Sequence, residues 1–185
     1  DRARFPVAAT DQLLASGLRG NIYNPDQFGG YLIWRTYPAR RVLTDGRNEL
    51  YLDLLRELPR AFADSRRWKR LFDRYDLALA VEEYRGGTIR VTNGATGRAE
   101  DLAPSRVYFP RSRWALIGFD DAAMVFARRD AFPPGAIARL EYRALDPERG
   151  AIDRSDPKRA AAELRRIAAS GADGRRLRMM VDASR

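Results

Sequence analysis

The residues of this chain best suited to binding chemistry lie between positions 21 and 47. Asn24 follows one short apolar segment, and Asp45, Gly46 and Arg47 follow a second one. An amide, a carboxylate and a guanidinium brought together at such positions could hold a polar ligand. Their types and spacing do not define a reaction.

A β-α-β unit is the arrangement that would position these groups. Residues 21–23 read as a strand, Asn24-Pro25 as a turn, residues 28–35 as an amphipathic helix entered through Gly29-Gly30, and residues 41–44 as a second strand. Ligands of open α/β sheets usually bind beyond the carboxyl ends of the strands. The residues that we predict to line this ligand-binding edge are Asn24, Gly29, Gly30, Tyr31, Asp45, Gly46 and Arg47.

Each part of this edge also has a purely structural interpretation. Asn24 or Asp26 could cap the helix, with Pro25 in its first turn and the glycines allowing close packing on a strand. Asp45-Gly46 could be a simple turn, with Gly46 at positive φ. The sequence leaves both interpretations open. It contains no G-x-G-x-x-G match here, which argues against a dinucleotide.

Two residue types that are central to catalysis are absent, because the chain has no histidine and no cysteine. It therefore lacks the usual general base near neutral pH, the commonest metal ligand, thiolate chemistry and disulfides. Any catalysis would have to rest on carboxylates, Tyr, Lys or Arg. We predict no catalytic residue, no metal site and no cofactor in this chain.

The formal net charge of +9 invites a nucleic-acid or anionic-membrane partner. The basic residues are nearly all arginines, since Lys69 and Lys158 are the lysines, and they are spread along the chain beside acidic residues. Phosphate-binding surfaces tend to cluster their charge, so the pattern argues against nucleic acid. A position close to a membrane surface fits the charge better. No apolar run approaches the length of about 18 residues that crosses a bilayer.

Further helices and strands follow from apolar spacing. We predict helices at residues 12–16, 48–62, 66–74 and 157–170, with Pro59 kinking or ending the second and Asp156 capping the last, and a buried strand at residues 76–81. One hairpin is expected around Asn93-Gly94, and a second joins residues 114–119 and 122–128 at Asp120-Asp121. Residues 138–142 read as a short strand, and residues 175–181 as a strand or a frayed tail.

These elements predict an α/β fold with three layers and a mainly parallel sheet that carries an antiparallel edge hairpin. We assign residues 5–130 to this domain and residues 131–185 to a C-terminal extension with one helix, at about residues 156–170. The start at Asp1-Arg2 suggests a piece of a longer protein.

Three other sets of residues have a favoured structural interpretation. Glu82-Glu83 is expected to be a solvated pair, although paired carboxylates at the ligand edge would be the functional alternative. Asp120-Asp121 is expected to be a hairpin turn rather than a metal site. Trp34, Trp68 and Trp114 are expected in the core rather than on a binding platform.

The segment from Phe5 to Tyr51 resembles the soluble C-terminal domains of bacterial multi-pass membrane proteins of the C-type glycosyltransferase kind, which are similar to protein mannosyltransferases. The pattern is Asn-Pro-x-x-aromatic-Gly-Gly-Tyr-Leu-Ile-Trp at residues 24–34, an Arg-Val-Leu strand at residues 41–43, and Asp-Gly-Arg at residues 45–47. Residues 114–129 look like the closing hairpin of those domains. The likeness covers about residues 5–130.

A more distant likeness is to the catalytic subunit of oligosaccharyltransferase, whose W-W-D-Y-G signature corresponds to the region of Asn24 to Tyr31. The double tryptophan is missing here, so the likeness does not imply recognition of a glycosylation sequon.

The resemblance implies a domain at the periplasmic face of the inner membrane that is inactive alone, because the family's catalytic carboxylate lies in the membrane portion. Its implied partners are that membrane portion and an acceptor peptide or lipid-linked sugar. A non-enzymatic protein-interaction module is the alternative.

Overall fold

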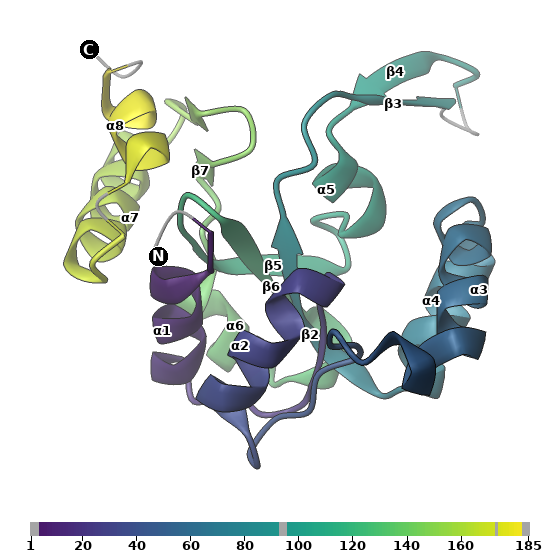
Figure 1. Ribbon diagram of the computed structural model, residues 1–185. Coiled ribbons are helices and arrows are strands. Elements are labelled where there is room, and N and C mark those ends of the chain that lie inside the picture. The colour runs from purple at the N-terminus through teal and green to yellow at the C-terminus, as the bar shows by residue number, and fades with distance from the viewer. Residues whose placement is uncertain (1–3, 93–95, 173, 183–185) are drawn as a thin grey trace.

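The computed structural model describes residues 4–92, 96–172 and 174–182 (Figure 1). The elements up to residue 83 are α1 (Val7–Ala15), β1 (Asn21–Tyr23), α2 (Asp26–Thr36), the 3-10 helix η1 (Asn48–Tyr51), α3 (Leu52–Phe62), α4 (Ser65–Arg74) and β2 (Leu77–Glu83). The elements that follow are β3 (Ile89–Thr92), β4 (Ala99–Leu102), α5 (Pro104–Tyr108), β5 (Trp114–Phe119), β6 (Ala123–Arg128), η2 (Arg129–Ala131), α6 (Pro134–Leu140), β7 (Leu145–Asp146), β8 (Ala151–Ile152), α7 (Pro157–Ala169) and α8 (Arg175–Asp182).

The main sheet is mixed and has four strands in the order β1-β2-β6-β5. β1 and β2 are parallel, whereas β6 is antiparallel to both β2 and β5. The predicted strand at residues 41–44 is reduced to one parallel bridge between Val42 and Ile22. The prediction of a mainly parallel sheet is therefore wrong. The predicted β5–β6 hairpin is present, but it places β6 directly beside β2 and so makes the second half of the sheet antiparallel.

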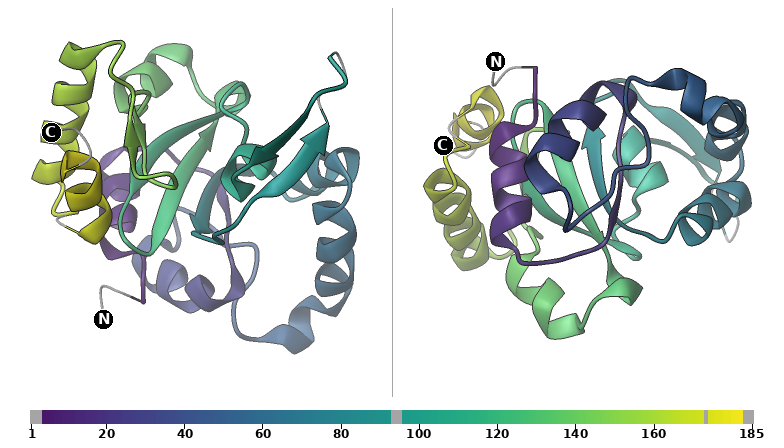
Figure 2. Two further views of the ribbon diagram at one scale, coloured as in Figure 1. Left: turned by 90° about the horizontal axis from the view of Figure 1, so that it is seen from above. Right: turned by 60° about the horizontal axis from the view of Figure 1, so that its bottom comes forward.

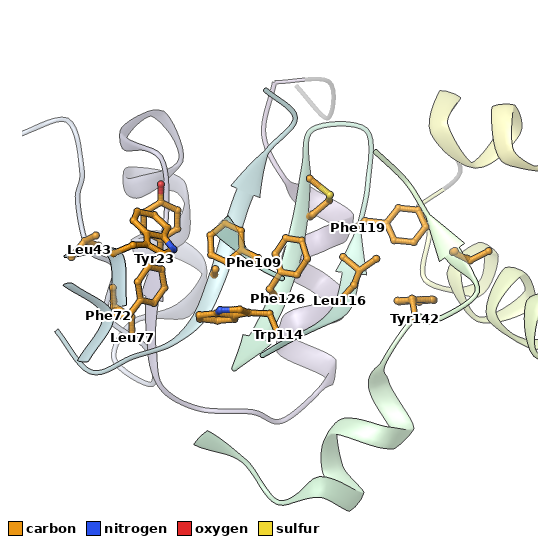
Figure 3. Close-up of a cluster of buried hydrophobic side chains, with 14 of the residues drawn as sticks. Tyr23, Leu43, Phe72, Leu77, Phe109, Trp114, Leu116, Phe119, Phe126 and Tyr142 are labelled. Carbon is orange, nitrogen blue, oxygen red and sulfur yellow. The ribbon is translucent and has the colours of Figure 1, made fainter. Parts of the chain in front are cut away.

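Both faces of the sheet are packed with apolar side chains, which explains why β2 shows no alternation in sequence. Along β6, Met124 and Phe126 belong to one core cluster, and Val125 and Ala127 belong to the other. Helices α1, α2 and α6 contribute to the Val125 cluster, and helices α3, α4, α7 and α8 contribute to the Phe126 cluster. Figure 2 shows how the helices lie around the sheet. The Phe126 cluster runs from Leu43 to Tyr142 (Figure 3).

Most of the predicted helices are present, and α4 and α7 begin with side-chain caps. Asp156 caps α7 as predicted, by accepting a hydrogen bond from the Arg159 N–H at 3.0 Å. Asp64 caps α4 by accepting hydrogen bonds from the N–H groups of Arg66 and Arg67. Helix α3 continues through Pro59 to Phe62. The lost hydrogen bond is tolerated because that side of the helix is exposed, so water can replace the missing N–H.

The two short hairpins differ in how much of them is described. Strands β3 and β4 pair antiparallel, as the first predicted hairpin requires. Its predicted turn at Asn93-Gly94 lies outside the described residues. The second hairpin turn, at Asp120-Asp121, is fully described and carries two helix caps.

Each carboxylate of the Asp120-Asp121 turn caps a different helix. Asp120 is buried, and it accepts hydrogen bonds from Ala9 in the first turn of α1 at 3.0 Å and from Ala123 at 2.9 Å. Asp121 accepts from the N–H groups of Arg175 and Arg176 at the start of α8, both at 2.8 Å. The turn thus joins the first and last helices of the chain to the same corner of the sheet.

The segment after residue 131 differs from the predicted extension with one helix. It forms α6, α7 and α8, and the predicted strand at residues 138–142 is wrong because α6 occupies residues 134–140. Residues 175–181 are helical rather than a strand or a tail. Tyr142, Ile167 and Met180 belong to the same core cluster as Phe126, so this segment packs on the sheet of the preceding residues.

The three tryptophans do not share one environment. Trp68 and Trp114 are buried, as predicted, but Trp34 is 76% exposed and the prediction for it is wrong. The buried stripe of α2 follows Phe28, Leu32 and Thr36, and Trp34 lies off that stripe. Within the described part of the chain, no helix combines the length and the apolar character needed to cross a membrane.

Candidate functional site

The predicted ligand edge starts where β1 and the Val42 bridge end together. Backbone hydrogen bonds from Ile22 N–H to the Arg41 carbonyl at 2.7 Å and from Leu43 N–H to the Ile22 carbonyl at 2.9 Å hold the two segments in parallel. The residues that follow, Asn24 and Asp45, consequently meet at the same edge of the sheet, as the β-α-β prediction requires.

The Asn24 side chain hydrogen-bonds to the backbone of both segments at this edge. Its side-chain amide donates to the carbonyls of Thr44 and Pro25, both at 2.9 Å, and its oxygen accepts from the Leu43 N–H at 3.0 Å. The residue is 3% exposed. Both of its donors are therefore used internally, and Asn24 serves as a clamp between the two segments rather than as a group that faces solvent.

Gly29 is required by packing, whereas Gly30 and Tyr31 lie elsewhere on α2. A Cβ atom on Gly29 would meet the backbone at Thr44 and approach the Cα of Asp45 to 2.6 Å. Gly30 is exposed and has no such neighbour. The Tyr31 ring packs against Phe5, just before α1, at a centroid distance of 5.5 Å, and its hydroxyl accepts from Arg35 of α2 itself. Gly30 and Tyr31 are thus not brought to the edge.

Asp45, Arg47 and Tyr51 form the exposed part of the edge. The Asp45 carboxylate accepts from Arg47 Nε at 2.8 Å, Arg47 Nη2 at 2.5 Å, the Arg47 backbone N–H at 3.0 Å and the Tyr51 hydroxyl at 3.0 Å. The Asp45 side chain is 5% exposed, but the Arg47 side chain is 65% exposed. The buried carboxylate therefore fixes one side of a guanidinium whose other side faces solvent.

The electrostatics match this geometry. Hydrogen bonds from the Arg47 side chain, opposed by burial, lower the pKa of Asp45 to about 2. The same carboxylate raises the pKa of Arg47 and, together with burial, that of Tyr51. At neutral pH Asp45 is an anion and Arg47 a cation held in a bidentate pair.

Gly46 forms the turn between Asp45 and Arg47, but its φ does not lie in the left-handed region, so the predicted positive φ is wrong. No atom lies within 4 Å of a Cβ built on it. Tyr51 was not among the predicted site residues. Its hydroxyl binds Asp45 from six residues further along the chain, a spacing that belongs to neither a helix nor a strand, so the sequence carries no signal for it.

A second polar cluster lies at the same end of β1 and β2, but inside the molecule. Glu82 is 2% exposed, so the expected solvated pair is wrong for this residue. Its Oε1 accepts from Arg85 Nε at 2.5 Å, and its Oε2 has no hydrogen-bond partner among the described residues. Glu83, by contrast, accepts from Gln27 near the surface at 2.5 Å.

Burial controls the titration of this cluster. Desolvation raises the pKa of Glu82 to about 7, with Arg85 opposing the rise and the charges of Glu83 and Glu148 adding to it. Desolvation also raises the pKa of the nearby Tyr23 hydroxyl, which lies 3.4 Å from Arg85 Nη2. Arg85 itself stacks over the Phe62 ring at 4.9 Å. Glu82 and Tyr23 are thus buried, whereas Arg85, whose side chain is 31% exposed, reaches them from the surface.

The edge presents hydrogen-bond donors that can recognise an anion. The exposed groups are the outer N–H donors of Arg47, and within the described residues no group of three or more acidic side chains is arranged to hold a metal ion. No family model matches the chain, and neither the known proteins nor the solved structures contain a significant match to it.

Proposed function

We propose that this chain is a periplasmic accessory or acceptor-binding domain of a membrane-embedded glycosyltransferase that uses polyprenyl-phosphate sugars. The proposal rests on the resemblance of residues 24–47 to such domains and on the geometry of the Asp45–Arg47 pair. The membrane portion of the same protein would supply the catalytic carboxylate, and this domain would contact the acceptor or the lipid-linked donor at the outer face of the inner membrane.

The observation that carries the proposal is the way Arg47 is held. Its guanidinium is oriented by two hydrogen bonds to a buried carboxylate, and its remaining N–H groups are open to solvent. A planar, pre-oriented guanidinium suits the oxygens of a phosphate or carboxylate. Because the charge of Asp45 offsets that of Arg47, a free anion would bind here weakly. Weak binding suits a domain whose ligand is held beside it by a membrane.

The finer fold prediction also belongs to this proposal. Core clusters on both faces of the sheet, each with helical contributions, support an arrangement of three layers. In such an arrangement the Arg47 side chain, which is 65% exposed, would be free to face the membrane portion.

The alternative is a non-enzymatic interaction module of a membrane protein. Two exposed aromatic side chains near the end of α2 favour it, because Trp34 is 76% and Tyr37 is 69% exposed. Exposed aromatic residues are enriched where proteins bind one another. Replacing Trp34 with Ala would disturb this function and leave sugar transfer unchanged.

A test needs the full-length parent in membrane vesicles, supplied with a radiolabelled polyprenyl-phosphate sugar. We expect Arg47→Ala to lower sugar transfer at least tenfold. Arg56→Ala is the matched control, since Arg56 is similarly exposed at 72% and pairs with Asp53, which is itself fully exposed. Equal transfer by the two variants, or a complete parent sequence without apolar spans of about 20 residues, would refute the proposal.

A further inference from the structure

A second surface site lies away from the Arg47 edge, between α4, α5 and the start of β5. It is a pocket of about 120 Å³ whose walls include Trp68, Phe72, Tyr108 and Trp114. An engineered cavity of about 150 Å³ is known to accept benzene, so the volume here suits one six-membered ring. We refer to this site as the Trp114 pocket.

The aromatic walls are fixed before any ligand arrives. The Trp68 indole N–H donates to the Tyr108 carbonyl at 3.0 Å, which ties α4 to α5. The ring centroids of Trp68 and Phe72 lie 4.8 Å apart, and those of Phe72 and Trp114 lie 5.2 Å apart in an edge-to-face arrangement. A further aromatic ring would add edge-to-face contacts of the same kind.

The acidic groups of the pocket are already paired with cations. Asp73 binds Lys69 at 2.5 Å and Arg128 at 3.3 Å, and Asp130 binds Arg128 at 2.7 Å. Neither carboxylate is therefore available to attract a cationic ligand.

The groups that remain are donors. Arg113 lines the pocket and is exposed, and its side chain has no ion-pair or hydrogen-bond partner among the described residues. Trp114 is 5% exposed, and no described residue accepts a hydrogen bond from its indole N–H. A ligand that satisfies both donors must present acceptor oxygens, and the guanidinium favours a negative charge on them.

We propose that the Trp114 pocket binds a small aromatic carboxylate, with its ring packed against the aromatic walls and its carboxylate on Arg113 and the Trp114 indole N–H. This site is separate from the Arg47 edge and does not depend on the function proposed for that edge. A neutral sugar is the competing ligand. Its hydroxyl groups would need hydrogen-bond acceptors in the pocket, and the carboxylates of Asp73 and Asp130 are already paired with cations.

Benzoate is the probe for this site, followed through the indole N–H signals of the three tryptophans in the whole chain. We expect saturable shifts of the Trp114 signal with a dissociation constant on the order of 1 mM, which is ordinary for a ligand of this size. Trp34, exposed on α2, serves as an internal control whose signal stays in place.

Charge recognition is tested by Arg113→Gln, which removes an exposed side chain and leaves the aromatic walls intact. We expect at least a fivefold loss of benzoate affinity, and no comparable change for neutral benzyl alcohol. Arg165→Gln, the same change at an exposed position on α7, should bind benzoate as the wild type does. The proposal is overturned if benzoate produces no saturable shift, if both variants bind equally, or if methyl mannoside shifts the Trp114 signal and benzoate does not.

Discussion

Replacing Glu82 with Gln should make this protein more stable above neutral pH. Glu82 is 2% exposed and shares its carboxylate with Arg85, while Tyr23, Glu83 and Glu148 face the same enclosed space. Burial raises its pKa from the ordinary 4.5 to about 7, so the folded protein prefers the neutral carboxyl group. Gln reproduces that neutral form at every pH.

Proton linkage gives the sign and the size of this change in the free energy of unfolding. Between pH 4.5 and about 7 the folded state holds a proton on Glu82 that the unfolded state has lost, so the free energy of unfolding falls as pH rises. At about 1.4 kcal/mol per pH unit, the wild type loses roughly 3 kcal/mol across this window. The stabilising contribution is complete below pH 4.5 and is gone above pH 7.

Urea denaturation of the wild type and Glu82→Gln from pH 4 to pH 9 measures this effect, since the difference between the two proteins removes the contributions of all other titrating groups. We expect the difference to be small at low pH and to grow to roughly 3 kcal/mol in favour of Gln at pH 9. A difference that stays constant with pH would show that Glu82 has the same pKa in the folded and the unfolded protein and that the burial argument is mistaken.

Four substitutions test the packing of the edge and one helix cap. Gly29→Ala should lower the free energy of unfolding, measured by heat or urea, by about 3 kcal/mol, because the new methyl group meets the backbone at Thr44 and Asp45. Gly30→Ala, which meets no neighbour, should be neutral or stabilise α2 by about 0.5 kcal/mol. Equal effects of the two substitutions would contradict the packing. Asn24→Ala should cost about 2 kcal/mol, because the buried Thr44 carbonyl loses its donor while the Leu43 N–H keeps its bond to the Ile22 carbonyl, and a loss below about 1 kcal/mol would argue against the clamp. Asp121→Ala removes the acceptor for two N–H groups at the start of α8, so hydrogen exchange should speed up in α8 at a cost of about 1 kcal/mol, and unchanged protection there would refute the cap.

Local patterns were enough to predict the part of the fold that positions the edge. Period and capping signals identified α2, β2, α7 and the β5–β6 hairpin. The Asn24 and Asp45 positions were correctly placed at one edge because a short helix between two parallel segments leaves little choice of topology. Whether that edge binds a ligand stays a prediction.

The errors share a cause, which is that local sequence does not specify tertiary partners. Residues 134–142 have apolar side chains at spacings that fit either a strand or a helical turn, and Pro134 at the first helical position is what marks α6. The burial of Glu82 depends on Arg85 and Tyr23, and the position of β6 depends on which strand the hairpin meets. Neither the burial of Glu82 nor the position of β6 can be inferred from the sequence of a single helix or strand.

The proposed function is tested most directly by titrating the isotope-labelled chain with a water-soluble, short-chain isoprenyl phosphate sugar while the side-chain Nε–H signal of Arg47 is followed by NMR. This signal is a sensitive reporter because the proton bonds to Asp45 and the outer guanidinium nitrogens are free. We expect saturable shifts at Arg47, Asp45 and Tyr51, with no change at Arg56. Shifts that are absent at Arg47, or equal at Arg47 and Arg56, would contradict the assignment of this edge as the ligand-binding site.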